Sequence, residues 1–220
     1  MRILLLGASG RVGSRFGRLA AEKHHQVTAL VRPSTTYDPP PGVRVVRGQV
    51  TEPSVLHELL PGHDVVVSCL GLRRTSKLPW ARLLSPPDLV ADVTQRLVSL
   101  MPESGVRRFV LLSAGGVGGT RYQSGWLVKR MIDAGNIGVA YRDLAAAEKT
   151  LEGSRLDWLA VQPVTLTDGK PSDRAGAVVS YGIRSSINQC STTFCGCHIA
   201  SDNINVPLLL DGFHGFDDVG

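Results

Sequence analysis

Short apolar runs alternate with segments of helical periodicity along the first three quarters of the chain. Six apolar runs have the length of a strand, and they cover residues 3–6, 27–31, 43–46, 64–70, 109–112 and 158–161. Between them, apolar positions at helical spacing predict helices over about residues 11–23, 52–61, 88–100 and 143–152. This β-α-β rhythm is typical of a doubly wound α/β fold, in which helices cover both faces of a parallel sheet.

The length of the chain agrees with this reading of the pattern. At 220 residues it fits one large domain, 1–220, with a sizeable buried core. The strand-helix alternation is clear through residues 1–167 and fades over residues 168–220. From Ser185 onward helix-forming residues are scarce, so we expect an irregular C-terminal region on the substrate side of the domain.

A glycine-rich turn joins the first expected strand to the first expected helix. Its sequence is Gly7-Ala8-Ser9-Gly10-Arg11-Val12-Gly13. Gly7 permits a tight turn, Gly10 lets the backbone approach a pyrophosphate, and Gly13 lets the helix pack closely. The helix N-terminus offers free N–H groups to phosphates. Strand, glycine turn, helix and second strand together predict a dinucleotide-binding site.

The end of the second expected strand favours NADP(H) over NAD(H). An acidic residue at this point would accept a hydrogen bond from the adenosine ribose, as NAD(H) sites require. This chain has Val31-Arg32-Pro33-Ser34 instead. Arg32 brings a fork of donors suited to a 2′-phosphate, although a solvated surface arginine is the alternative.

Charge and cysteine usage limit the other partners that we expect. The net charge is +5, but it is scattered, and no run of five like charges predicts nucleic-acid binding. The apolar start at residues 3–6 is too short for an export signal, and no stretch of about 18 apolar residues could cross a membrane. We therefore expect a cytoplasmic protein with reduced thiols, a small-molecule substrate, and a monomer by default, with a dimer possible.

One cluster near the C-terminus has metal-ligating side chains. Cys195, Cys197 and His198 are spaced more tightly than usual zinc ligands, and no second pair accompanies them beyond Cys190 and His214. No metal is expected.

Several ordered motifs together resemble one known family. They are Gly7 to Gly13; Val31-Arg32; Gly48-Gln49-Val50; Val67-Ser-Cys-Leu-Gly71 followed by Arg73; Phe109-Val-Leu-Leu-Ser113-Ala114; and Leu156-Asp-Trp-Leu-Ala-Val-Gln-Pro163. Over about residues 2–167 the chain resembles the atypical short-chain dehydrogenases with an NmrA-like, NAD(P)H-binding domain. Within that group it is similar to the flavin and biliverdin-IXβ reductases.

The resemblance implies where the cofactor would lie. Arg32 would meet the 2′-phosphate, Gln49 and Val50 the adenine, and Arg73 the far end of the cofactor; the family usually has aspartate in place of Gln49. Ser113 and Ala114 would lie beside the nicotinamide, whose carboxamide pocket would be shaped by Pro163, Val164 and Thr165. The full set of implied cofactor positions is Gly7, Ser9, Gly10, Arg11, Val12, Gly13, Arg32, Gln49, Val50, Leu70, Gly71, Arg73, Ser113, Ala114, Pro163, Val164 and Thr165.

The proton donor of the wider superfamily is missing. Its classical members use a tyrosine with a lysine four residues later, and Tyr122, Tyr141 and Tyr181 are followed at that distance by tryptophan, alanine and serine. Hydride transfer would then depend on the cofactor, with the protein supplying orientation. Candidate catalytic residues are Ser113, Arg73 and Tyr122. A capping serine, a solvated arginine and a packing tyrosine are the respective alternatives.

Together these features favour one function over two others. The leading hypothesis is an NADP(H)-dependent oxidoreductase that reduces a small aromatic, quinone-like or flavin-like acceptor without a tyrosine-lysine pair. The alternatives are a non-enzymatic NADP(H) sensor and a non-redox isomerase or lyase on the same fold.

Overall fold

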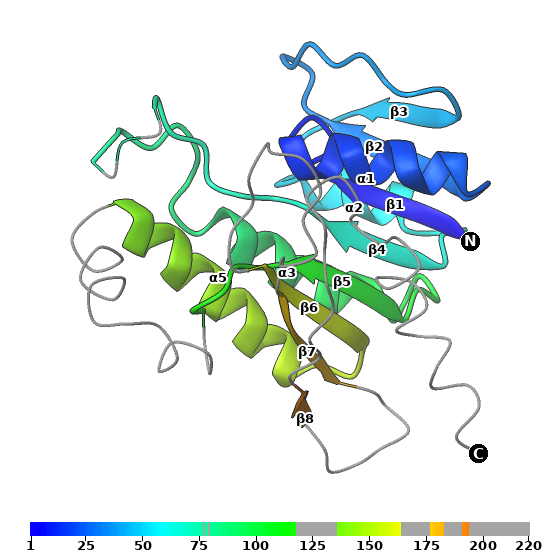
Figure 1. The fold of residues 1–220 in the computed structure, drawn as a ribbon. Coiled ribbons are helices and arrows are strands. Elements are labelled where there is room, and N and C mark those ends of the chain that lie inside the picture. Colours follow the sequence, from blue (N-terminus) through cyan, green and yellow to red (C-terminus); the bar gives the residue numbers. More distant parts are fainter. Residues whose placement is uncertain (77, 79, 118–135, 164–176, 183–190, 194–220) are drawn as a thin grey trace.

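A single sheet runs through the molecule, with helices on both of its faces (Figure 1). The computed structural model describes residues 1–76, 78, 80–117, 136–163, 177–182 and 191–193. The strands are β1 (Arg2–Leu6), β2 (Gln26–Val31), β3 (Val43–Arg47), β4 (Val65–Ser68), β5 (Arg108–Leu112), β6 (Asp157–Pro163), β7 (Ala177–Gly182) and β8 (Ser191–Thr193). The described helices are α1 (Arg11–Glu22), α2 (Pro53–Leu59), α3 (Leu89–Leu100) and α5 (Asn136–Glu152).

The strand order is β3-β2-β1-β4-β5-β6-β7-β8. The first six strands are parallel, as the β-α-β rhythm predicts. The chain runs outward from β1 to β3 and then returns to place β4 on the other side of β1. The order therefore reverses between β1 and β4, and in open α/β sheets ligands bind outside the carboxyl ends of the strands at that point.

Two strands extend the sheet beyond the six that the sequence predicts. β7 pairs with β6, and β8 pairs with β7, both antiparallel. Both strands lie within residues 168–220, where the strand-helix alternation of the sequence fades. The short apolar run at the start of β7 pairs with β6, which would otherwise be an open edge of the sheet.

Strand residues alternate between two hydrophobic layers. Ile3 and Leu5 face the layer that contains Phe16 and Ala20 of α1. Leu4 and Leu6 face the opposite layer, to which α2, α3 and α5 contribute their apolar sides. Burial on both faces explains why the strands are continuous apolar runs.

Helix α3 is capped from another helix. Asp88 occupies its N-cap position without a side-chain capping bond. Instead, the carboxylate of Asp143, on α5, accepts hydrogen bonds from the backbone N–H groups of Val90 (3.0 Å) and Ala91 (2.8 Å). This contact fixes α5 against the start of α3 and so sets the position of both helices beneath the sheet.

No helix in the described ranges combines the length and the apolar character that crossing a membrane requires.

Candidate functional site

The glycine turn after β1 is held tightly against the end of β4. Gly7 has a φ of +77°, and a Cβ there would lie 2.5 Å from the carbonyl oxygen of Cys69. A Cβ on Gly13 would collide with the Gly7 carbonyl, so Gly13 allows the helix to approach the turn itself. The N–H of Gly10 donates to the Gly7 oxygen at 3.0 Å, which closes the turn. Glycine is thus required at positions 7 and 13 by the protein's own backbone.

Helix α1 begins directly after this turn. Its N-cap is Gly10, no side chain caps it, and its first turn contains no acidic residue. The positive end of the helix dipole is therefore not neutralised by a capping carboxylate. Such a helix start can bind phosphate oxygens when they lie in front of it.

A cavity of about 660 Å³ opens beside the turn, at the carboxyl ends of the central strands. Four loops contribute to it, which follow β1, β2, β3 and β4, and the last of them leads into α3. Its lining residues are Gly7, Ser9, Gly10, Leu30, Val31, Arg32, Ser34, Thr35, Thr36, Gly48, Gln49, Val50, Thr51, Cys69, Leu70, Gly71, Arg73, Leu84, Ser85, Pro86 and Leu89. The volume lies within the range of ordinary small-molecule sites.

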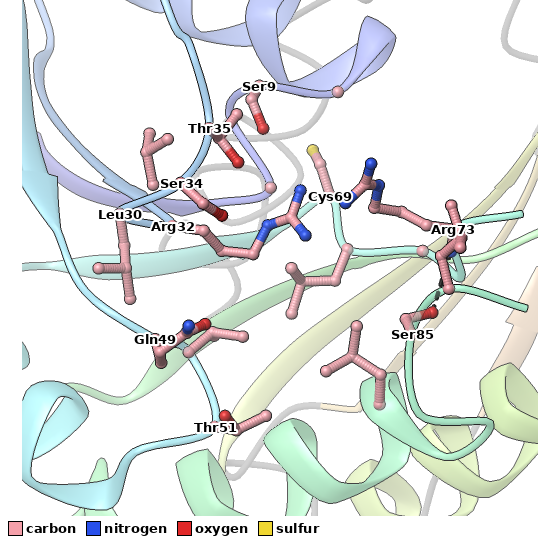
Figure 2. A pocket seen from close by; sticks show the side chains of 18 of the residues that line it. Ser9, Leu30, Arg32, Ser34, Thr35, Gln49, Thr51, Cys69, Arg73 and Ser85 are labelled. Atoms are coloured by element: carbon pink, nitrogen blue, oxygen red, sulfur yellow. Dashed lines mark hydrogen bonds between the residues drawn. The ribbon is translucent and has the colours of Figure 1, made fainter. Parts of the chain in front are cut away.

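Two arginines provide the charge of this cavity. Figure 2 shows the guanidinium groups of Arg32 and Arg73 pointing toward one another across it. Burial lowers the pKa of Arg32, and the positive charge of Arg73 lowers it further. Neither arginine forms a salt bridge with a described carboxylate, and none of the described aspartates and glutamates lines the cavity. The cavity therefore presents uncompensated positive charge, which suits an anion.

The position of Arg73 differs from the expectation. The resemblance placed it near the far end of the cofactor, but the structure brings it beside Arg32. The loop after β4 turns back because the N–H of Arg73 donates to Ser85 Oγ at 3.0 Å and the N–H of Leu84 donates to the Arg73 carbonyl at 2.8 Å. A role for Arg73 at the reacting end stays a prediction.

Part of the cavity wall comes from segments that the sequence analysis did not assign to the site. Ser34, Thr35 and Thr36 add hydroxyl groups next to Arg32, and residues 84–86 with Leu89 close the side toward α3. No short motif marks residues 84–89. Their approach to the cavity depends on the antiparallel contact between Arg74 and Leu83.

One thiol also lines the cavity. Burial raises the pKa of the Cys69 thiol to about 12. Cys69 therefore remains a neutral thiol at physiological pH and is not an activated nucleophile.

The other expected site residues fall into two groups. Arg11, Val12, Gly13, Ser113, Ala114 and Pro163 are described but do not line this cavity. Tyr122, Val164 and Thr165 lie outside the described residues, as do Cys195, Cys197 and His198. Within the described ranges, no group of three or more His, Cys, Asp or Glu side chains could hold a metal ion.

Ser113 lies at the carboxyl end of β5 and is buried, with 6% of its surface exposed. Its N–H donates to the Val161 carbonyl at 2.8 Å, which fixes the backbone between β5 and β6. Nearby, Tyr141 donates its hydroxyl to the Gly115 carbonyl at 3.2 Å, and burial raises the pKa of Tyr141. Tyr141 thus holds the loop after β5 to helix α5, in agreement with a packing role.

The sequence model of the NAD(P)H-binding family matches residues 7–187, which is most of the chain and includes the glycine turn and the whole cavity wall. The chain belongs to this family. The family-level resemblance drawn from the ordered motifs is confirmed, and so is NAD(P)H as the cofactor class.

Solved structures show the same fold for this NAD(P)H-binding protein. An anaerobilin reductase, ChuY, from Escherichia coli O157:H7 has a TM-score of 0.63 and 19% identity, with 100% of this chain and 91% of that chain covered. The oxidoreductase ylbE from Lactococcus lactis has a TM-score of 0.62 and 20% identity, over 79% and 73% of the two chains. The Bordetella bronchiseptica enzyme WbmH, solved with NAD+, has a TM-score of 0.56 and 19% identity, over 77% and 57%. At this level of identity, the likeness establishes the Rossmann-type arrangement and not the substrate.

Proposed function

We propose that this protein is an NADP(H)-dependent oxidoreductase that transfers hydride to a small aromatic, quinone-like or flavin-like acceptor without a tyrosine-lysine pair. The observation that carries the proposal is the cavity with two arginines and, among its described lining residues, no carboxylate. A ligand with phosphate groups would neutralise this charge, and the family supplies the class of that ligand.

The residues that are present fit a dinucleotide. The pyrophosphate would lie before Ser9 and Gly10, in front of the uncapped start of α1. The adenine would lie against Gln49 and Val50, at the rim after β3. Leu70 and Gly71 would follow the path of the cofactor along the end of β4, where a Cβ on Gly71 would meet no atom within 4 Å.

Arg32 is the residue that would select NADP(H). It follows β2, where an NAD(H) site needs a carboxylate to accept from the ribose hydroxyls. Arg32 would instead donate to the 2′-phosphate, and Arg73 beside it would add a second positive charge. Ser34 and Thr35 supply further hydroxyl donors at the same place.

The acceptor class rests on the sequence resemblance to flavin and biliverdin-IXβ reductases. ChuY, described as an anaerobilin reductase, has the same fold, which is consistent with a conjugated acceptor of this kind. Reduced NADP supplies the hydride when it is bound. The chain's own contribution is to orient the two reactants and to supply a proton to the acceptor.

The test is titration of the purified protein with NADPH and NADH, followed by turnover with FMN and a panel of quinones. We expect tighter binding of NADPH than of NADH, and acceptor-dependent loss of the reduced cofactor's absorbance. Binding without oxidation of any acceptor would refute the reductase, whereas the absence of binding to either nucleotide would refute the assignment of the cavity.

One observation favours a non-enzymatic NADP(H) sensor as the second candidate. The loop between β4 and α3 extends away from the sheet (Figure 1), and it exposes 73% of Trp80 and 51% of Leu78. Its base contains Arg73 and Ser85, which line the cavity. A sensor would bind NADPH without oxidising it, and a change in Trp80 fluorescence, lost in Trp80→Phe, would report the signal.

A further inference from the structure

Three polar side chains are enclosed in the apolar layer beneath the carboxyl ends of β5 and β6. Ser113 follows β5, Gln162 lies near the end of β6, and Glu148 lies on α5, which packs on that face of the sheet. Their exposed fractions are 6%, 1% and 6%. The surrounding side chains of this layer are apolar, and among them are Leu111, Ala147, Leu151, Trp158 and Ala160.

The hydrogen bonds within this cluster are unequally distributed. Gln162 Nε2 donates to Glu148 Oε1 at 2.7 Å. Ser113 Oγ is buried and forms no hydrogen bond of regular geometry with any described residue. It nevertheless lies close enough to the carboxyl group of Glu148 to influence its pKa. The Ser113 hydroxyl is therefore the unpaired polar group next to the glutamate.

No cation in the described part of the chain compensates the charge of Glu148. It forms no salt bridge with any arginine, lysine or histidine in the described part of the chain. Burial raises the pKa of Glu148, the contacts with Ser113 and Gln162 oppose this, and the negative charge of Glu152 one turn away adds to the rise. An ionised carboxylate enclosed without a cation is costly, and the neutral acid avoids this cost.

We propose that Glu148 is held as a neutral carboxylic acid and that it positions Ser113 as the proton donor of the site. This inference rests on the reductase function proposed above. Because Oε1 accepts the amide hydrogen of Gln162, the O–H of the acid is available to donate elsewhere, and Ser113 Oγ is the adjacent acceptor without a partner. A serine that accepts this bond directs its own hydrogen away from the glutamate.

The proton then follows a balanced path. The acceptor gains a hydride from the reduced cofactor and a proton from Ser113 Oγ, while Ser113 recovers a proton from the Glu148 acid. The Glu148 carboxylate regains its proton from water. In total, the reduced cofactor, the acceptor and one proton from solvent give the oxidised cofactor and the acceptor with two hydrogens added. Ser113 would touch the acceptor, and Glu148 would act through Ser113 as a positioning residue.

The first test measures the protonation of Glu148 directly. The full chain, labelled with 13C at the glutamate side-chain carboxyl, is examined by infrared spectroscopy at pH 7. We expect the carbonyl band of a protonated acid that is absent in Glu148→Gln and present in Glu58→Gln, which changes an exposed glutamate on α2. In Ser113→Ala the band should move to higher frequency, because the acid loses its acceptor. A missing band, or a band that Ser113→Ala leaves in place, would overturn the proposal, even where Glu148→Gln fails to fold.

The second test separates the proton role from a packing role. Glutamine has the shape of glutamate and can donate to Ser113, but it cannot release a proton. We expect Glu148→Gln to lower kcat by at least about tenfold, with KM and the Kd for NADPH changed by less than about twofold. An unchanged kcat would reject the proton role while the reductase stands. If the wild-type protein binds NADPH but reduces no acceptor, the reductase function is refuted. The infrared band would still show whether Glu148 is protonated and bonded to Ser113.

Discussion

The two halves of the ligand edge are built from opposite kinds of polar group. Around β1, β2 and β4, charged guanidinium groups and backbone amides face an open cavity whose described lining contains no carboxylate. Around β5, β6 and α5, Ser113, Gln162 and Glu148 are enclosed, and Gln162 donates to Glu148. The first arrangement suits an anion, whereas the second is suited to holding a proton. On the function proposed above, binding and chemistry would use different electrostatic environments within one sheet.

The largest expected effect comes from the glycine turn. Gly7→Ala should lower the free energy of unfolding by about 3 kcal/mol. The alanine would have to adopt a left-handed φ, and its Cβ would lie 2.5 Å from the Cys69 oxygen. Urea denaturation measures the loss. The matched control is Gly71→Ala, where a Cβ meets nothing within 4 Å and where we expect a change below about 0.5 kcal/mol. Equal losses in the two variants would contradict the close packing of the turn.

The second effect concerns cofactor choice. Arg32→Ala should weaken NADPH binding by about 10- to 100-fold and leave NADH binding within about twofold, because the lost charge-assisted bonds involve only the 2′-phosphate. Arg44→Ala, an exposed arginine on β3 that does not line the cavity, is the control. Fluorescence titration measures the Kd of each variant for both nucleotides. A similar loss for NADPH and NADH would remove the argument for NADP(H) preference.

The third effect separates stability from binding. Asp143→Ala removes the acceptor of two backbone N–H groups at the start of α3 and should lower the free energy of unfolding by about 1–2 kcal/mol. The Kd for NADPH should not change, because Asp143 lies outside the cavity. Asp88→Ala provides the control, since Asp88 occupies the N-cap without making a capping bond. A loss of NADPH affinity in Asp143→Ala would show that the two halves are not independent.

The smallest effect is a change of stability with pH. Because the folded-state pKa of Glu148 is raised above its unfolded value, its stabilising contribution is complete below the ordinary glutamate pKa. It is lost as the pH rises through the raised value. Glu148→Gln should therefore gain stability relative to wild type with increasing pH, measured as the denaturant midpoint at a series of pH values. The curve of Glu58→Gln should stay parallel to that of wild type, and a constant difference for Glu148→Gln would contradict the raised pKa.

The cavity half of the site could largely be predicted from the sequence, because its determinants are local. The glycine spacing and the position of Arg32 directly after an apolar strand are visible in short windows. The place of Arg73 beside Arg32 was not expected and the wall at Leu84 to Leu89 was missed, because both depend on how a long loop pairs with itself.

The enclosed half could not be predicted in the same way. Glu148 stands among the apolar positions of α5, and a buried carboxyl there is a recognisable anomaly. Its meaning depends on Gln162 and Ser113, which are brought to it only by the pairing of β5 with β6 and by the packing of α5 on that face. Likewise, β7 and β8 extend the sheet through long-range antiparallel pairing rather than through a strong local pattern.

The way the glycine turn is held has a consequence for the evolution and redesign of this protein. The turn packs against the backbone just after β4 and against itself, so Gly7 and Gly13 have almost no mutational freedom. Pro33, Ser34 and Thr36 are exposed and can vary without disturbing any core residue. A change of coenzyme preference can therefore be made in a few exposed positions after β2 while the scaffold stays the same. Selection for use of the other nicotinamide cofactor would act on that loop first.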